Sequence, residues 1–356
     1  MTGRNDVDMS KIIRTVAAIG AISVAAAFST HSANAQSMEE TYEGQTLTIL
    51  IGHPPGGSYD LYAQLAAEFM GEHIPGNPNI IVQHQPGGGG RRAAATFINN
   101  TDPDGLMVAV LPDSLGHIQF LRPDAASWDA SAFRYIGRFA TANVAFAVRA
   151  DKATNAEEMR DQEIIVACTG RNARSAQQAA AMMNVAGLNL RMICGYDGSQ
   201  ATVLAALRGE ADMLSQNYAS FVSDPNDLGD GTLNIVVQTG LERHPDMADV
   251  PLMQELTDDP DAQAVLRFLG ASAPIGRSMM IHPDSPEYII EGLQTAFDAM
   301  LADPDFLAAA EQRSAIIEHA TGDQMNAIMI EIMGASEELI TNVLAAIDTS
   351  SAQEVQ

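Results

Sequence analysis

The feature that most constrains the fold is a unit that occurs twice in succession. In each unit a run of residues that favour β-strands is followed by a glycine-rich loop and then by a helical pattern. Residues 47–51 end in the loop 53–57, and residues 80–82 end in the loop 86–90. Apolar residues recur at helical spacing after the first loop, helix-forming residues follow the second, and a third β-rich run covers 106–111. Strands that alternate with helices in this way predict a parallel sheet with helices on its faces.

A second series of strand and helix patterns begins after Arg149. The expected strands cover residues 163–168, 191–194, 211–215, 233–237, 273–281 and 316–317, and the expected helices cover 175–185, 201–208, 286–301 and 324 to about 346. We therefore expect an α/β protein of two doubly wound lobes with a ligand cleft between them. Lobe 1 is expected to span 36–142 and lobe 2 to span 143–272, while 273–356 supplies a returning strand and C-terminal helices that pack on lobe 1.

Residues 1–35 have the pattern of an export signal. Lys11 and Arg14 precede the mostly apolar run 15–28, and an Ala-Asn-Ala site ends at Ala35. The alternative is a membrane anchor, but the run is shorter than the ~20 residues that span a bilayer. We predict cleavage after Ala35 and a mature chain in the periplasm.

The composition argues against several classes of protein. With 45 Asp and Glu against 19 Lys and Arg, the formal net charge is −26, so the chain offers no basic face for DNA or RNA. Two Cys and eight His without a short ligand spacing argue against a structural metal. Neither glycine loop has the lysine of a P-loop or the spacing of a dinucleotide fingerprint, and no nucleophile elbow occurs. We expect no cofactor and no catalytic residues.

The two glycine loops form the expected ligand site, because ligands of open α/β sheets bind beyond the carboxyl ends of the strands. Glycine allows a close approach of the backbone, so the N–H groups of Gly56 to Ser58 and of Gly87 to Gly90 are expected to face an anion. Asp60 either caps the first helix or accepts a hydrogen bond from the ligand.

A series of motifs runs along almost the whole mature chain. They are Leu50 to Asp60, Ile74-Pro75-Gly76-Asn77-Pro78, Pro86 to Gly90, Pro103-Asp104-Gly105, Cys168-Thr169-Gly170, Gly195 to Ser199 and Leu207 to Asp212. In order and spacing they resemble the substrate-binding proteins of tripartite tricarboxylate transporters, the Bug (TctC-like) family. The resemblance implies a periplasmic binding protein of the Venus flytrap type that closes on a small organic acid and delivers it to membrane permease subunits. It implies no enzymatic activity, and we expect a monomer.

The chain departs from the family pattern in the loops. Gly52 and His53 stand where the family has a proline and an aromatic residue, which changes the pocket wall. Arg171 and Arg174 stand in a loop that is usually rich in Gly and Ser; they either donate to a ligand carboxylate or form solvated charges at a helix start. Tyr196 either contacts the ligand or packs beneath its loop. The expected ligand-binding residues are His53, Pro55, Gly56, Gly57, Ser58, Asp60, Gly87, Gly88, Gly89, Gly90, Thr169, Gly170, Arg171, Arg174, Ser175, Tyr196 and Gly198.

Two alternatives to a transport role remain. One is a ligand sensor that presents its closed form to a signalling partner, and the other is a periplasmic enzyme, for which no positioned nucleophile or acid–base pair is found. Cys168 and Cys194 fall near the ends of successive expected strands, which lie ~4.8 Å apart when they are neighbours. They form either a disulfide or two buried thiols. The sequence leaves open which acid is bound and how many of its carboxylates are recognised.

Overall fold

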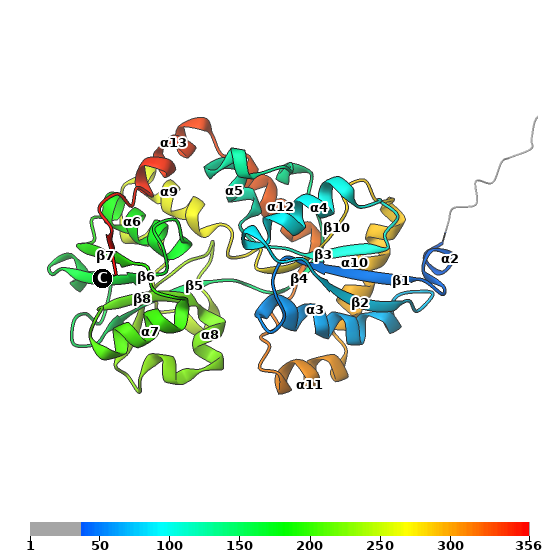
Figure 1. The fold of residues 1–356 in the computed structure, drawn as a ribbon, viewed down its shortest axis with the longest axis horizontal. Coiled ribbons are helices and arrows are strands. Elements are labelled where there is room, and N and C mark those ends of the chain that lie inside the picture. Colours follow the sequence, from blue (N-terminus) through cyan, green and yellow to red (C-terminus); the bar gives the residue numbers. More distant parts are fainter. Residues whose placement is uncertain (1–36, 356) are drawn as a thin grey trace, which may run out of the picture. The chain divides into compact units, whose positions relative to one another are not determined.

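The computed structural model describes residues 37–355, and Met38–Gln356 forms one compact unit. The expected signal peptide and its cleavage site after Ala35 lie outside the described residues. Within residues 37–355, two six-stranded sheets carry helices on their faces, which confirms the expected two-lobed α/β architecture (Figure 1). No helix in this range combines the length and the apolar character needed to cross a bilayer.

The first sheet has the strand order β11-β4-β10-β3-β1-β2. Its strands are β1 (Thr46–Ile51), β2 (Asn79–His84), β3 (Met107–Val110), β4 (Arg134–Ala140), β10 (Arg277–Ile281) and β11 (Ala320–Thr321). β1 runs parallel to β2 and β3, as the two strand–loop–helix units predict, with Ile49 opposite Val82 and Val108. β10 is antiparallel to both β3 and β4, so the complete sheet is mixed.

Helices bury both faces of β1. The helices of the first lobe are α2 (Met38–Tyr42), α3 (Ser58–Phe69), α4 (Arg91–Asn100), α5 (Leu115–Leu121), α10 (Glu287–Leu301), α11 (Pro304–Gln312) and α12 (Gly322–Met333). Leu47, Ile49 and Ile51 belong to a core shared with α3 and α10, whereas Leu50 belongs to a core shared with α4 through Phe97. A strand covered on both faces is apolar at most of its positions, and four of the five residues at 47–51 are Leu or Ile, which is why this run was recognisable in the sequence.

The second sheet has the strand order β12-β7-β6-β8-β5-β9. Its strands are β5 (Val144–Arg149), β6 (Ile164–Cys168), β7 (Leu190–Cys194), β8 (Met213–Asn217), β9 (Leu233–Gln238) and β12 (Gln353–Glu354), and its helices are α6 (Arg174–Ala186), α7 (Ser199–Arg208), α8 (Tyr218–Ser223), α9 (Pro260–Gly270) and α13 (Glu337–Ala346). β6 is parallel to β7 and β8, and β5 is antiparallel to β8 and β9.

Short 3-10 helices occur in both lobes. They are η1 (Met70–His73), η2 (Gly88–Gly90), η3 (Pro123–Ala125), η4 (Ala130–Ala132), η5 (Glu158–Arg160), η6 (Pro225–Leu228), η7 (Pro245–Met247) and η8 (Met253–Leu256).

The carboxylate of Glu318 stabilises the segment between β4 and β5, where the chain crosses from the first lobe to the second. Glu318 accepts hydrogen bonds from the N–H and hydroxyl of Thr141 at 2.9 and 2.6 Å. It also forms an ion pair at 2.8 Å with His244, which follows β9 of the second lobe. The two lobes are therefore joined by side chains as well as by the crossing chain.

The end of the chain differs from the expectation. The single helix expected over 324 to about 346 is two helices, because Ser336 caps a new helix by accepting a hydrogen bond from the N–H of Leu339 at 3.1 Å. The second of these, α13, packs against α6 and α9, and β12 pairs with β7 (Figure 1). The expectation that the whole of 273–356 packs on lobe 1 is therefore wrong for α13 and β12.

Four strands also differ from the sequence prediction. The short strand expected at 316–317 lies at β11, and the returning strand begins at Arg277 because the residues before it form a turn that ends at Gly276, with φ +52°. β4 and β5 were not predicted. Residues 141–143 between them contain no glycine or proline, so no strong breaker marks the point where one strand ends and the other begins.

Candidate ligand-binding site

The first glycine loop joins β1 to α3 and is held by Asp60. The N–H of Gly56 donates to one carboxylate oxygen of Asp60 at 2.8 Å, and Nε2 of His84 lies 2.8 Å from the other. Burial raises the pKa of Asp60, but the hydrogen bonds from Gly56 and His84 outweigh it, so the pKa lies below its ordinary value. Asp60 thus stabilises its own loop, and the N–H groups of the first turn of α3 remain without partners inside the helix.

The second glycine loop needs glycine at each position. Gly87, Gly88, Gly89 and Gly90 all have positive φ, at 146°, 60°, 66° and 86°. A Cβ added to Gly52 would lie 2.5 Å from Cα of Gly90, so the end of β1 and the second loop are in direct contact. The two loops therefore lie side by side at the carboxyl ends of their strands, as expected.

Tyr59 forms the centre of a buried polar cluster beside these loops. The ring of His53 stacks on that of Tyr59 with centroids 4.2 Å apart. The guanidinium carbon of Arg277 lies 4.1 Å from the centre of the Tyr59 ring, and Arg277 donates to the Tyr59 hydroxyl at 3.2 Å and to the Ser58 hydroxyl at 2.9 Å. Burial, together with Arg277, lowers the pKa of His53, so this side chain is neutral at pH 7; it lines none of the three cavities described below.

Asp113 connects this cluster to the second lobe. Its carboxylate accepts a hydrogen bond from the Tyr59 hydroxyl at 3.4 Å and forms an ion pair with Arg174, the first residue of α6, at 2.9 Å. The Asp113 side chain is 3% exposed and that of Arg174 is 36% exposed. Burial raises the pKa of Asp113, but Arg174 and Arg277 outweigh it and hold the pKa below its ordinary value. Arg174 therefore reaches the first lobe, where it binds a carboxylate of the protein itself.

Three cavities adjoin the cluster. The largest, which we call the Arg277 cavity, has a volume of about 560 Å³ and is lined from both lobes by residues that include Ser58, Thr141, Asn217 and Arg277. The Arg174 cavity, of about 280 Å³, is lined by residues that include Gly89, His117, Arg122, Asn172 and Arg174. The third, of about 200 Å³, lies within the second lobe and is lined by Thr169, Ser175 and Thr202 among others. Together they offer space for a small molecule next to two guanidinium groups.

The structure places the expected ligand-binding residues as follows. Those that line a cavity are Gly56, Gly57, Ser58, Asp60, Gly88, Gly89, Thr169, Arg174 and Ser175. Gly170 accepts a hydrogen bond from the N–H of Ala173 at 2.9 Å, and Gly198 precedes α7 with φ 85°. Tyr196 packs against a small cluster of buried alanines, as the packing alternative predicts. Pro55, Gly87 and Gly90 lie within the two loops.

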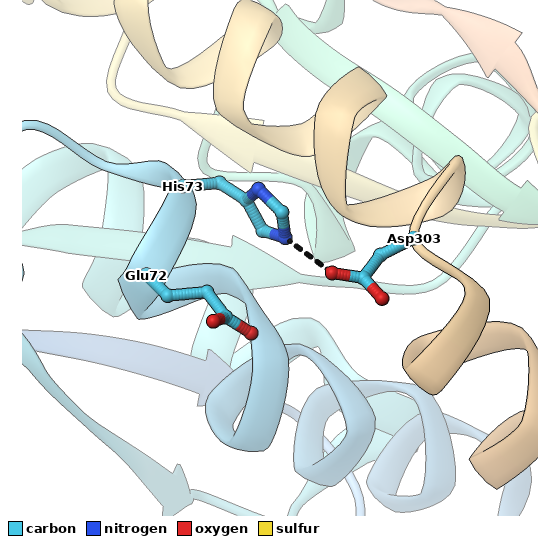
Figure 2. A group of neighbouring side chains, drawn as sticks. All are labelled: Glu72, His73 and Asp303. Carbon is cyan, nitrogen blue, oxygen red and sulfur yellow. Dashed lines mark ion pairs between the residues drawn. The ribbon is translucent and has the colours of Figure 1, made fainter.

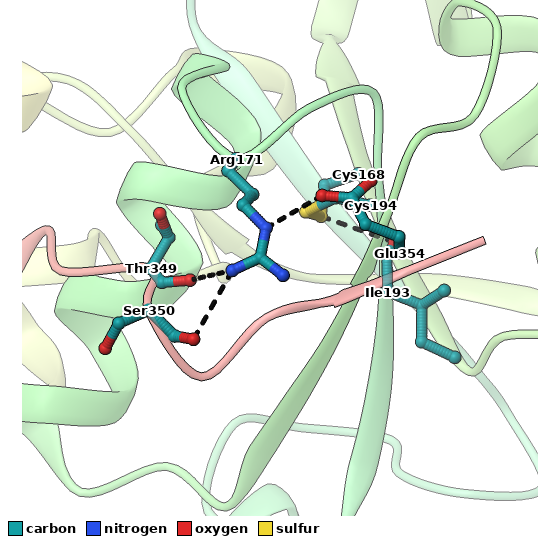
Figure 3. The surroundings of a disulfide bond; sticks show 7 residues. All are labelled: Cys168, Arg171, Ile193, Cys194, Thr349, Ser350 and Glu354. Carbon is teal, nitrogen blue, oxygen red and sulfur yellow. Dashed lines mark hydrogen bonds and ion pairs between the residues drawn. A yellow bond between two sulfur atoms is a disulfide. The ribbon is translucent and has the colours of Figure 1, made fainter.

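Arg171 does not lie with Arg174. Its Nε forms an ion pair at 2.8 Å with Glu354 in β12, and its Nη1 donates at 3.3 Å to the carbonyls of Thr349 and Ser350 (Figure 3). Arg171 thus holds the C-terminal segment of the chain. Of the two roles considered for this residue, the ion pair at the surface is the one seen.

Cys168 and Cys194 form a disulfide beneath the same segment (Figure 3). They are directly opposed residues of the parallel strands β6 and β7, with Cα atoms 4.4 Å apart. Of the two alternatives that the sequence left open, the structure has the bridge. The disulfide joins the two strand ends from which the loops of the second lobe emerge.

Sequence reasoning missed Arg277 and Asp113. Asp113 follows the expected strand 106–111 at its carboxyl end, so the argument that selected the glycine loops could also have selected it. No local pattern marks Arg277, because it lies 218 residues from Tyr59 in the sequence.

A separate group of polar side chains lies on the first lobe, away from these cavities. Glu72, His73 and Asp303 each contribute one carboxylate oxygen or ring nitrogen that could bind a metal ion, and these three atoms lie within 4.8 Å of one another (Figure 2). His73 forms an ion pair with Asp303 at 3.2 Å, and Asp303 also accepts a hydrogen bond from the N–H of Asp305 at 2.7 Å. These contacts join η1 to the start of α11.

No family model matches the sequence, and no curated protein matches it. Solved structures do match. A TctC solute-binding protein from Polaromonas is 21% identical with a TM-score of 0.68, over 85% of this chain and 99% of that one. The periplasmic binding protein BugD is 18% identical with a TM-score of 0.59, over 88% and 100% of the two chains. MatC from Rhodopseudomonas palustris, solved with bound malate, is 18% identical with a TM-score of 0.56, over 85% and 99%. The chain therefore has the fold of the TctC- and Bug-type solute-binding proteins, which confirms at the level of the fold the resemblance that its motifs indicated.

Proposed function

We propose that this protein is a periplasmic solute-binding protein that captures a small organic carboxylate and delivers it to the permease subunits of a tripartite tricarboxylate-type transporter. It binds its ligand without catalysing a reaction. The shared fold with TctC- and Bug-type proteins supports this role, and the malate bound to MatC supports a carboxylate as the ligand. The glycine loops and the cavities between the lobes supply the binding site.

The main structural support for this proposal is that Arg277 lines a cavity without an acidic ion-pair partner among the described residues. Within residues 37–355, no Asp or Glu forms an ion pair with it, whereas Arg174 and Arg171 each have a carboxylate partner. A guanidinium has five N–H donors, and the hydrogen bonds to Ser58 and Tyr59 use two of them. In a chain with a net charge of −26, a cation without an acidic partner at a cavity wall is well suited to an external anion.

The N-terminus of α3 adds to the positive electrostatic potential in the Arg277 cavity. Ser58 is its first residue, and both Ser58 and Arg277 line the Arg277 cavity. The positive end of a helix contributes ~0.3 to 1 kcal/mol to the binding of a negative group. A carboxylate in this cavity could accept hydrogen bonds from the guanidinium and from the backbone of the loop at once.

Substitution of Arg277 tests the proposal. Arg277→Ala should weaken the binding of the cognate acid by about 10- to 100-fold, which corresponds to ~1.5 to 3 kcal/mol for a charge-assisted hydrogen bond, and Arg277→Lys should restore only part of the affinity. A panel of organic acids, sugars and nucleotides is first screened by thermal unfolding, and the best ligand is then titrated by calorimetry.

Arg134→Ala is the matched control, because Arg134 lies on β4, lines none of the three cavities and forms an exposed ion pair with Glu287 of the same lobe at 2.8 Å. Its affinity should equal that of the unmodified protein. Stabilisation by a sugar or a nucleotide in place of every organic acid, or unchanged affinity in Arg277→Ala, would contradict the proposal.

A further inference from the structure

The cluster between the lobes contains two cations and one anion. Arg277 and Arg174 are the cations, and Asp113 is the anion. His53 and His117 adjoin the cluster, but burial lowers the pKa of both, that of His117 to about 4, so both are neutral at pH 7. Burial also raises the pKa of the tyrosine at the centre, which is uncharged. These groups therefore carry one net positive charge. Asp60 also lines the Arg277 cavity, but its carboxylate is already bonded to the N–H of Gly56 and to His84, and it is not counted in the cluster.

Asp113 is fixed in this position. One oxygen of its carboxylate accepts hydrogen bonds from Arg174 at 2.9 Å and from Tyr59 at 3.4 Å. The other oxygen is buried and has no hydrogen-bond partner among residues 37–355. A ligand carboxylate that took Asp113's place at Arg174 would leave a buried and unpaired charge, which is strongly unfavourable.

We propose that Asp113 acts as an internal carboxylate that limits the site to ligands with one carboxylate, held at Arg277, and excludes a second carboxylate from the position beside Arg174. This inference rests on the proposed function. Buried charges are stable only when they are paired, and one ligand carboxylate balances the net positive charge of the cluster. A second one would lie close to Asp113, and like charges at short distance in a weakly solvated site repel strongly.

Two further arginines line the Arg174 cavity but do not compensate for Asp113. Arg91 donates from Nε to the carbonyl of Gly88 at 2.7 Å, and Arg122 donates to the carbonyl of Asn172 at 3.4 Å. Both contacts are at the exposed rim, where water and salt screen the charges. The buried carboxylate of Asp113, paired with Arg174, therefore determines the preference.

Matched pairs of acids test this proposal. Butyrate and succinate, and hexanoate and adipate, differ only in the second carboxylate. Calorimetric titration of the wild-type protein should show each monocarboxylate bound at least about tenfold more tightly than its dicarboxylate. Asp113→Asn keeps the shape and an acceptor for Arg174 while it adds one net positive charge, so it should shift this ratio by about tenfold or more toward the dicarboxylate.

Two more variants complete the test. The double variant Asp113→Asn with Arg174→Gln returns the net charge to its original value, and it should restore the preference for the monocarboxylate. Arg174→Gln alone leaves no net positive charge and should weaken the binding of both acids. Asp305→Asn, an exposed position at the start of α11, is the control and should leave the ratio unchanged.

The outcomes separate this inference from the proposed function. Equal or tighter binding of the dicarboxylates by the wild-type protein, or an unchanged ratio in Asp113→Asn, would overturn the role of Asp113 and leave carboxylate binding intact. If no acid binds to a protein that melts cooperatively, the proposed function and this inference both fail. If Asp113→Asn does not fold, the wild-type ratio and the affinities of Arg174→Gln decide.

Discussion

Removal of the disulfide between Cys168 and Cys194 should destabilise the protein without changing its fold. The bridge joins opposed positions of two neighbouring strands, and both side chains are fully buried. The double substitution Cys168→Ala and Cys194→Ala removes it and introduces no new polar group into the core. The expected result is a lower free energy of unfolding and looser loops at the ends of the two strands.

The magnitude follows from the length of chain that the bridge closes. The two cysteines are separated by 26 positions. The entropy lost by an unfolded chain with a loop of this length corresponds to ~3.5 kcal/mol at 25 °C. Since domains typically unfold with ~5 to 15 kcal/mol, the disulfide accounts for a substantial part of the stability.

Urea unfolding provides the measurement. Trp128 is the one tryptophan of the chain and is 8% exposed, so its fluorescence should change on unfolding. The alanine variant and the wild-type protein unfolded in the presence of reductant should share a lower midpoint than the oxidised wild type. Reductant should have no effect on the variant. A single midpoint for all samples would refute the argument, because it would mean that no bridge stabilises the protein.

Three further predictions concern single positions. Arg171→Ala should leave ligand affinity unchanged and lower the free energy of unfolding by at most ~1 kcal/mol, because its partner Glu354 is exposed; a tenfold loss of affinity in calorimetry would place Arg171 in the site. Gly90→Ala should lower the thermal midpoint more than Gly89→Ala, since both have positive φ but only the Cβ at Gly90 would collide, with a proline ring; equal midpoints would contradict this. The pKa of Asp113 lies below its ordinary value of 3.8, so its contribution is present above that pH and is lost as the pH falls through the folded-state pKa. The difference in urea midpoint between wild type and Asp113→Asn should therefore shrink below about pH 4 and not at higher pH.

The parts of the fold that were predictable are those with a local physical cause. Gly87 to Gly90 all have a positive φ that other residues rarely adopt, so the loop is visible in the sequence. The strand at 47–51 is covered on both faces, and its mostly Leu and Ile composition indicates this. Cys168 and Cys194 could likewise be placed at the ends of successive predicted strands. Their spacing alone did not decide whether they form a disulfide.

The parts that were not predictable depend on contacts between distant segments. Arg171 and Arg174 stand three positions apart in one loop, yet one binds Glu354 at the far end of the chain and the other binds Asp113 in the first lobe. Nothing in the loop itself distinguishes them. The place of Arg277 in the cluster likewise depends on its stacking against Tyr59, which lies in the other half of the sequence. Such pairings are set by topology, which no local pattern contains.

The order in which the chain is synthesised matters for a molecule built in this way. The first sheet is complete only when β10 and β11 have been added, and the second requires β12 at residues 353–354. In a chain that emerges from its N-terminus, β3 and β4 therefore lack the strand that joins them until β10 is available, and the outer edge of β7 stays unpaired until β12 is available. Pairings over such distances form slowly. We expect each sheet to be completed only after these late strands have been synthesised.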